Sequence, residues 1–289
     1  MITTFGWGGP PILVLDENPG ACAAYSLRRL SGLYNGPAIR VRRSSDNAEQ
    51  DIYFTDTNNF DITAFNAFVG VSTAYVRTWY DQSGNGKDVG QTTIAKQPIC
   101  DGMQLSFFDT GSHSYTGLVC NSFSNGFQYI GGGSIYVVAK ANDNNSGGNN
   151  IWDVLISQGD GSNYMVNLSF TKTFIGSWLK GEFSAGSSRT IDGNSNKITN
   201  TYYLINTQWS NFSTIQTDGT FKLRFNSIEN SPYTITGTNP SSLNSNILSI
   251  GTTSNTGFYG LWGSMKEVIL YPTNNNNALD SNINHYYSI

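Results

Sequence analysis

The chain has 289 residues, of which 38% are hydrophobic and only 12% carry Asp, Glu, Lys or Arg side chains. The charged fraction is about half of the ~25% usual for globular domains, so uncharged polar residues must cover the surface. The formal net charge of −4 gives no electrostatic reason to expect a nucleic acid partner. No window approaches the ~20 apolar residues of a membrane span, so no membrane insertion is predicted.

The first fifteen residues are rich in Gly and Pro and carry no charge before Asp16. We expect residues 1–15 to form an extended arm that docks on a neighbouring subunit, in a homo-oligomer or larger assembly, because such a segment orders only when it is buried. The apolar side chains assigned to this arm are Phe5, Trp7, Ile12 and Leu13. The N-terminus lacks a basic region and an apolar core, so no secretory signal is predicted.

The next elements are predicted from periodicity and capping signals. Apolar residues at helical spacing predict a helix over 21–33, and the alternation at 39–42 predicts a strand. Asp61 is a candidate N-cap for a second helix over 61–69. A further strand is predicted over 75–80, followed by a Gly-rich turn at 83–86.

From residue 98 onward the pattern is almost entirely that of short strands. The clearest are 134–139, 164–168, 202–205, 221–225, 247–250 and 266–271. Turn-forming clusters separate them, which is typical of a β-sandwich or jelly roll. A closing helix is predicted over 278–287, with Leu279, Ile283 and Tyr286 on one face. Without an internal repeat or linker, residues 16–289 are predicted to form one domain.

Three short motifs occur in a fixed order in the first third of the chain. They are Gly20 to Leu30, Tyr34 to Asp46 and Trp79 to Gly86. Together they resemble the N-terminal part of the catalytic domain of family-54 α-L-arabinofuranosidases. They also resemble phage tail and virion-surface proteins with LamG-like sandwiches. The resemblance implies a mainly β, concanavalin A-like (LamG-type) antiparallel sandwich with a few short helices.

The resemblance also implies where catalytic carboxylates should stand, and other residues occupy those positions. In the arabinofuranosidases the nucleophile Glu follows a Gly-Asp-Gly turn, and the matching strand here ends at Ser169. Asn167 stands where a substrate-contacting Asp is expected, and Thr253 where the acid/base Asp is expected. A retaining glycosidase needs two carboxyl groups. We therefore expect no hydrolytic activity.

Other candidate sites have simpler interpretations. Asp143 and Asp192, each near Asn residues, could bind calcium, although polar hairpin loops are the alternative. No other cofactor is predicted. Arg40, Arg42 and Arg43 are expected to form local ion pairs, because acidic residues follow them directly. The carboxylate in the Tyr-Asp-Gln-Ser-Gly-Asn-Gly turn, Asp81, is expected to cap turn amides rather than to act in catalysis.

The three cysteines, Cys22, Cys100 and Cys120, have no short spacing, which argues against a disulfide framework and against zinc. A Cys100–Cys120 bridge and three buried thiols both remain open. Trp152, Trp178 and Trp209 lie beside polar stretches and are candidates for stacking on a sugar, with burial in the core as the alternative. The only histidines are His113 and His285, too few for a His-rich metal site.

These features predict a non-enzymatic virion surface protein of a phage, with a tail, receptor-binding or capsid-decoration role. It would attach to a host glycan through a lectin-like face. The residues assigned to that face are Trp152, Asn167, Ser169, Trp178 and Thr253. Two alternatives stand beside it: an arabinofuranosidase-like glycoside hydrolase, and a purely structural oligomer or filament subunit.

Overall fold

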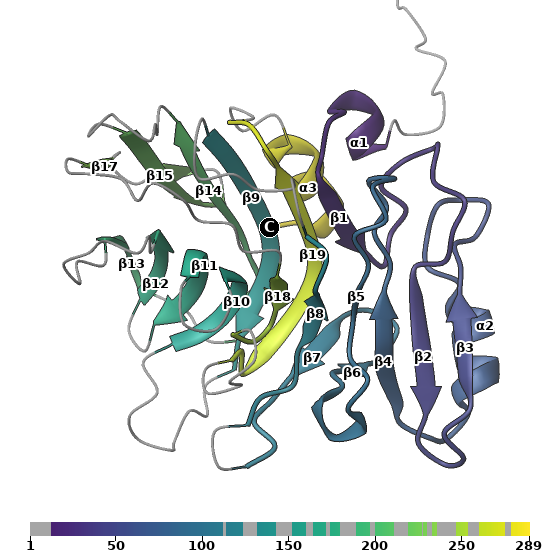
Figure 1. The fold of residues 1–289 in the computed structure, drawn as a ribbon. Coiled ribbons are helices and arrows are strands. Elements are labelled where there is room, and N and C mark those ends of the chain that lie inside the picture. Colours follow the sequence, from purple (N-terminus) through teal and green to yellow (C-terminus); the bar gives the residue numbers. More distant parts are fainter. Residues whose placement is uncertain are drawn as a thin grey trace, which may run out of the picture.

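The computed structural model shows an antiparallel β protein with three short α-helices in its described part (Figure 1). The described residues are 13–111, 114–123, 132–142, 152–159, 164–171, 174–179, 189–196, 200–210, 219–226, 228–229, 233–235, 247–253, 260–274 and 279–289.

The strands form one continuous network that divides at β4 (Ala74–Trp79) into two branches. The C-terminal end of β4 pairs with β5, whereas its N-terminal end pairs with β6. On its other side β4 pairs with β2 (Ile39–Arg43), which pairs with β3 (Glu49–Ile52). The division turns one sheet into two facing layers.

The first branch, here called the front layer, runs in the order β5, β8, β18, β10, β11, β12, β13. Its strands are β5 (Val89–Gly90), β8 (Leu118–Cys120), β18 (Leu248–Ile250), β10 (Trp152–Gly159), β11 (Tyr164–Thr171), β12 (Phe174–Leu179) and β13 (Arg189–Asn196).

The second branch, the back layer, runs in the order β6, β7, β19, β9, β14, β15, and β1 also pairs with β19. Two short strands, β16 and β17, pair with β15. The strands are β6 (Ile99–Cys100), β7 (Leu105–Phe107), β19 (Gly263–Tyr271), β9 (Gly132–Ala141), β14 (Tyr203–Ser210), β15 (Gly219–Phe225), β16 (Ile228–Glu229), β17 (Tyr233–Ile235) and β1 (Ala23–Ser26).

The main hydrophobic core lies between the two layers. Strand alternation fills it: Val137 and Ala139 of β9 come from the back layer, and Leu168 and Ile250 from the front layer. Trp209 is also fully buried in this core, so its candidacy as an exposed sugar platform is wrong. The predicted sandwich is confirmed.

A second apolar cluster covers the outer face of the back layer. Tyr136 and Val138 point away from the main core and contact residues of α1 (Val14–Glu17) and α3 (Asp280–Tyr287). Val14 and Leu15, which were assigned to the docking arm, are buried here within their own chain. Residues 1–12, with Phe5, Trp7 and Ile12, lie outside the described residues, and Leu13 is half-buried ahead of α1.

Two of the predicted helices are confirmed. In α2 (Ile62–Val69) the Asp61 carboxylate accepts the Ala64 amide at 2.9 Å, as expected of an N-cap. Helix α3 buries Leu279 and Ile283, although Tyr286 is 46% exposed. It packs over the guanidinium of Arg28, which lies 4.2 Å from the Tyr286 ring centroid.

The predicted helix over 21–33 is wrong, because residues 23–26 form strand β1 beside β19. Side chains distant in the sequence take the backbone amides that a helix would need. Asp81 accepts the amide of Ala24 at 2.9 Å, and Gln82 accepts that of Leu30 at 2.8 Å. These long-range bonds hold the segment in an irregular path over the sheet.

The sequence predictions for the polar side chains are largely confirmed. Arg40 binds Asp51 through two hydrogen bonds of 2.8 and 2.6 Å, and Arg43 binds Asp46. Arg42 instead donates to Gln97 at 2.7 Å and to Asn47 at 2.7 Å.

The cysteines are free and buried, so the Cys100–Cys120 bridge does not form. None of the helices in the described ranges is long and apolar enough to cross a membrane.

Candidate functional site

Three buried serines mark the face of the front layer that points away from the main core. Ser249 lies between Leu248 and Ile250, which both point into the core, so its own side chain points to the opposite face. The same alternation applies to Ser157 after Ile156 and to Ser169 after Leu168. Ser157 pairs directly with Ser249 across β10 and β18. We call these three residues the serine row.

Among the described residues, no group forms a hydrogen bond with the hydroxyls of the serine row. All three serines are completely buried, and the Oγ atoms of Ser157, Ser169 and Ser249 are unsatisfied. Buried polar side chains in folded proteins are nearly always paired, with protein groups or with ordered water. Because bulk solvent does not reach these hydroxyls, ordered water enclosed in the structure is the partner that can satisfy them.

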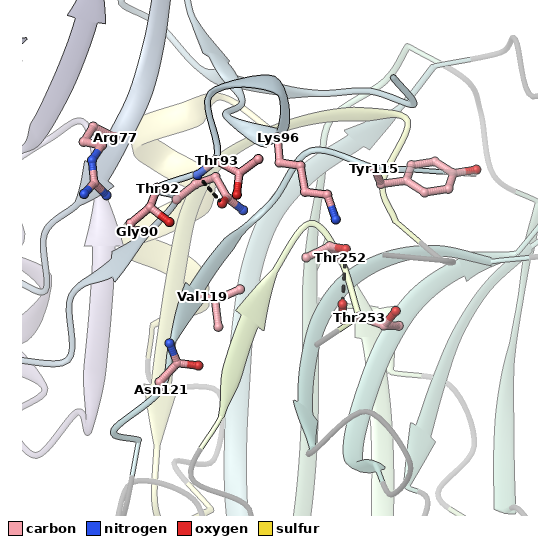
Figure 2. Close-up of a pocket in the computed structure, with 11 residues that line it drawn as sticks. Arg77, Gly90, Thr92, Thr93, Lys96, Tyr115, Val119, Asn121, Thr252 and Thr253 are labelled. Atoms are coloured by element: carbon pink, nitrogen blue, oxygen red, sulfur yellow. Dashed lines mark hydrogen bonds between the residues drawn. The ribbon is translucent and has the colours of Figure 1, made fainter. Parts of the chain in front are cut away.

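A cavity of about 380 Å³ lies on the same face of the front layer (Figure 2). Val119 of β8 lines it and pairs directly with Ser249, and Gly90 on the neighbouring strand β5 pairs with Val119. The volume is that of a small-ligand site. The lining residues are Arg77, Gly90, Gln91, Thr92, Thr93, Lys96, Tyr115, Val119, Asn121, Thr252 and Thr253.

Close backbone contacts set the shape of this cavity. Gly251 has a φ of +76°, and a Cβ there would lie 2.2 Å from the ring of Phe107. Glycine therefore allows the chain to turn sharply after β18, with its amide donated to the Leu155 carbonyl at 2.8 Å. The turn brings Thr252 and Thr253 to the cavity, where the Thr252 hydroxyl donates to the Thr253 carbonyl at 3.3 Å.

The lining is polar and carries positive charge. Arg77 comes from β4, and Lys96 from the short 3₁₀ helix Ile94–Lys96. In Figure 2, Lys96 extends from its loop on the side of Thr252, and Arg77 lies beyond Gly90. None of the eleven lining residues is Asp or Glu. Threonine hydroxyls and the amide of Asn121 complete a surface suited to hydrogen-bonding a polyhydroxylated ligand, whereas the Gln91 amide is bonded to Gly117 and Thr93.

The buried carboxylates among the described residues have structural partners. Asp81 accepts the amides of Ala24, Ser83 and Lys87 at 2.9–3.0 Å, as a turn cap. Glu267 binds Arg28 at 2.7 and 2.8 Å, and this pair is completely enclosed by the second cluster. Burial of the Tyr287 hydroxyl beside Glu267 raises the pKa of this tyrosine.

Two further buried carboxylates complete this set. Asp280 binds Arg224, and Asp153 accepts the amide of Trp262 at 3.2 Å. These groups hold the fold together.

The structure brings two of the predicted site residues to this face. Thr253 lines the cavity, and Ser169 belongs to the serine row. The backbone of Asn167 pairs with Ser157 on one side and with Trp178 on the other. The side chains of Trp152, Asn167 and Trp178 lie outside the described part of the structure.

The calcium candidate around Asp143 also lies outside the described part of the structure. At the second candidate, the backbone of Asp192 is described and its side chain is not. In the described residues there is no group of three His, Cys, Asp or Glu side chains that could hold a metal ion.

Several residues of this face escaped the sequence analysis. Ser157 and Ser249 each follow an apolar residue that points into the core. A polar residue that alternates with apolar ones in a strand can be recognised in the sequence as a residue of the opposite face. Arg77 and Lys96 could not be recognised from the sequence, because each resembles an ordinary surface cation. Only the pairing of β5 with β8 shows that both line one cavity. Asn121 follows β8 directly and lies in a turn.

Comparisons with known proteins give a consistent picture. Residues 13–151, just under half of the chain, match the family model described as "Alpha-L-arabinofuranosidase B, catalytic". No curated protein sequence matches the chain.

Among solved structures, the chain is similar to an arabinofuranosidase complexed with arabinofuranosyl-α-1,2-xylobiose. That match has 17% identity and a TM-score of 0.63, and covers 91% of this chain and 62% of that one. It is also similar to a family-54 α-L-arabinofuranosidase soaked with a cyclic sulfate inhibitor. There the identity is 16%, the TM-score 0.61, and the coverage 90% and 61%.

These findings correct the functional prediction. The matching family model describes a catalytic domain and the similar structures are arabinofuranosidases, so the prediction of a non-enzymatic phage virion protein is wrong. The phage, tail and capsid assignments have no support. That prediction gave the residues at two positions, Ser169 and Thr253, more weight than the motifs of the first third. The chain has the fold of these enzymes and spans about three-fifths of their length.

Proposed function

We propose that this chain is a glycoside hydrolase that acts on α-L-arabinofuranosyl groups of a glycan. The match of residues 13–151 to a catalytic-domain family supports the proposal. So does the fold, shared with an enzyme that was crystallised with an arabinofuranosyl-xylobiose. The observation that carries it is the polar cavity of about 380 Å³ on one face of that fold, lined by threonine hydroxyls and side-chain amides.

The residues of this face would bind the sugar rather than cleave it. The cavity supplies the groups for this binding: the hydroxyls of Thr92 and Thr93 and the amide of Asn121 can donate to and accept from the hydroxyls of a pentose. The serine row lies on the same face, but its three residues are completely buried and do not line the cavity, so no sugar contact is assigned to them.

Hydrolysis needs a pair of carboxyl groups about 5–5.5 Å apart in a retaining enzyme, or about 6.5–9.5 Å apart in an inverting one. Ser169 and Thr253 cannot supply the charge that stabilises an oxocarbenium-like transition state. The acidic residues that follow β10 and precede β14 in the sequence are Asp160, Glu182 and Asp192. The backbone of Asp192 is in register with Gly176, which pairs with Ser169. We propose that the pair comes from these three.

The test combines turnover and binding. Release of arabinose from an aryl α-L-arabinofuranoside and from an arabinofuranosyl-xylobiose would be measured for the wild type and for Asp160→Asn, Glu182→Gln and Asp192→Asn. Removing an acid/base group should lower kcat at least about 100-fold. Asp46→Asn is the matched control, because its carboxylate pairs with Arg43 on the exposed β2–β3 hairpin.

Two results would contradict the proposal. One is the absence of turnover by the wild type while the oligosaccharide still binds. The other is turnover that survives in all three variants. Thermal unfolding of each variant, compared with the wild type, separates loss of catalysis from loss of folding.

A further inference from the structure

The cavity beside the serine row is lined by two cations that have no carboxylate within hydrogen-bond distance among the described residues. Arg28, Arg40 and Arg43 each hold a carboxylate at 2.6–2.7 Å. Arg77 has only a loose ion pair, with Nε 3.6 Å from Glu49, which is beyond hydrogen-bond distance. Its guanidinium therefore keeps N–H donors available for another partner.

Lys96 is the second such cation. Within the described ranges its ammonium group has no ion pair and no hydrogen bond, and its side chain extends on the side of Thr252 (Figure 2). It is held in place by its backbone, since the Lys96 carbonyl accepts the amide of Gly117 at 3.0 Å. The main chain from which the Lys96 side chain extends is thus fixed at the end of a short 3₁₀ helix.

The cavity lining itself holds no acidic residue to offset these charges, and the only carboxylate paired with either of them among the described residues is Glu49, 3.6 Å from Arg77 and outside the lining. The other nine lining residues are uncharged: Gly90, Gln91, Thr92, Thr93, Tyr115, Val119, Asn121, Thr252 and Thr253. Two like charges that face one concave site raise its potential and attract an anion, and the low-dielectric walls strengthen the effect. A neutral sugar would need only the hydroxyls and amides. The two cations therefore indicate that the ligand also carries a negatively charged group.

We propose that this cavity binds a carboxylate of the glycan substrate, as carried by a uronic acid unit next to the arabinofuranosyl branch. The planar fork of Arg77 can form two parallel hydrogen bonds to one carboxylate, with Lys96 as a point charge at the other end. Thr93 and Asn121 would then contact the hydroxyls of the acidic sugar. The inference rests on the proposed function for the arabinofuranosyl branch and adds the class of the backbone sugar.

Binding, not turnover, tests this proposal. Calorimetry would compare a xylo-oligosaccharide that carries one uronic acid with the neutral oligosaccharide of the same length, using wild type, Lys96→Gln and Arg77→Gln. Each variant should bind the acidic oligosaccharide about tenfold more weakly and the neutral one as before. The variant Arg77→Lys keeps the charge but loses the fork, and should fall between. Arg43→Gln, with the same change in charge outside the cavity, should match the wild type.

Salt and a second anion complete the design. Affinity for the acidic ligand should fall as the salt concentration rises, because the Debye length shrinks from about 10 Å at 0.1 M to about 3 Å at 1 M. Affinity for the neutral ligand should stay constant. A sulfated oligosaccharide that binds more tightly than the uronate would assign the cavity to sulfate esters and overturn the carboxylate proposal.

Equal affinities for the acidic and neutral ligands, or unchanged binding in both Lys96→Gln and Arg77→Gln, would also overturn it. If the enzyme fails to release arabinose but still prefers the uronate, the proposed activity fails and the carboxylate site stands.

Discussion

Replacing Asp81 by Ala tests whether this carboxylate acts in the fold or in catalysis. Asp81 is 3% exposed and accepts four hydrogen bonds, from the amides of Ala24, Ser83 and Lys87 and from the Ser83 hydroxyl, at 2.8–3.0 Å. It joins the turn after β4 to strand β1, which lies 57 residues earlier in the chain. Its removal should therefore loosen the attachment of β1 to the sheet.

The magnitude follows from which donors lose their partner. A hydrogen bond to a charged acceptor contributes about 1.5–3 kcal/mol, and an orphaned buried donor costs about 1–3 kcal/mol. The amide of Ala24 is completely buried and cannot reach water, whereas those of Ser83 and Lys87 lie in a partly exposed turn. We expect Asp81→Ala to lower the free energy of unfolding by about 3–5 kcal/mol in total. At roughly 2–3 °C per kcal/mol for a chain of this size, Tm should fall by about 6–15 °C.

Differential scanning calorimetry and urea unfolding would measure the change, with Asp46→Ala on the exposed hairpin as control. Turnover of Asp81→Ala, measured well below its own Tm, should equal that of the wild type. A Tm within about 2 °C of the wild type would refute the structural role. Loss of turnover in a fully folded variant would show that Asp81 takes part in catalysis.

Three further predictions follow from other described residues. Ser249→Ala should change the free energy of unfolding by less than about 1 kcal/mol, because no hydrogen bond to a described residue is lost; a large loss of stability in thermal unfolding would contradict this. The hydrogen bonds from Arg40 hold the pKa of Asp51 below its ordinary value of 3.8. The contribution of this carboxylate to stability is therefore present above pH 4 and is lost as the pH falls through the lower folded-state pKa. In urea unfolding, the difference between wild type and Asp51→Asn should disappear in strong acid, and a difference that persists there would disprove the assignment. Burial raises the pKa of Cys22 and brings that of Cys100 to about 12, so a thiol reagent at neutral pH should modify them only on unfolding; rapid labelling of the native protein would show that the sites open.

Local signals in the sequence sufficed where neighbouring residues decide the structure. Asp61 caps α2 by accepting an amide three residues later, and Arg43 binds Asp46 within one hairpin. The alternation of apolar residues likewise specifies which strands exist, since each buries one face. For these elements the interacting residues lie close together in the chain, so composition and spacing are enough to predict them.

The site depended on pairing between distant strands. Ser157 and Ser249 are neighbours only because β10 and β18 pair, and Val119 and Gly90 join them through β8 and β5. Arg77 and Lys96 face one cavity for the same reason. No local pattern reports which strands become neighbours, so these residues look unrelated in the sequence.

The sequence by itself determined an antiparallel β architecture, helices α2 and α3, and the turn-capping role of Asp81. The tertiary structure alone decided that residues 23–26 form a strand and that Trp209 belongs to the core. It also brought Arg77 and Lys96 to one cavity that has no acidic residue in its lining. The reason is physical: capping and alternation are set by contacts within a few residues, whereas burial and the occupants of a sheet face depend on which distant strands form hydrogen bonds with one another.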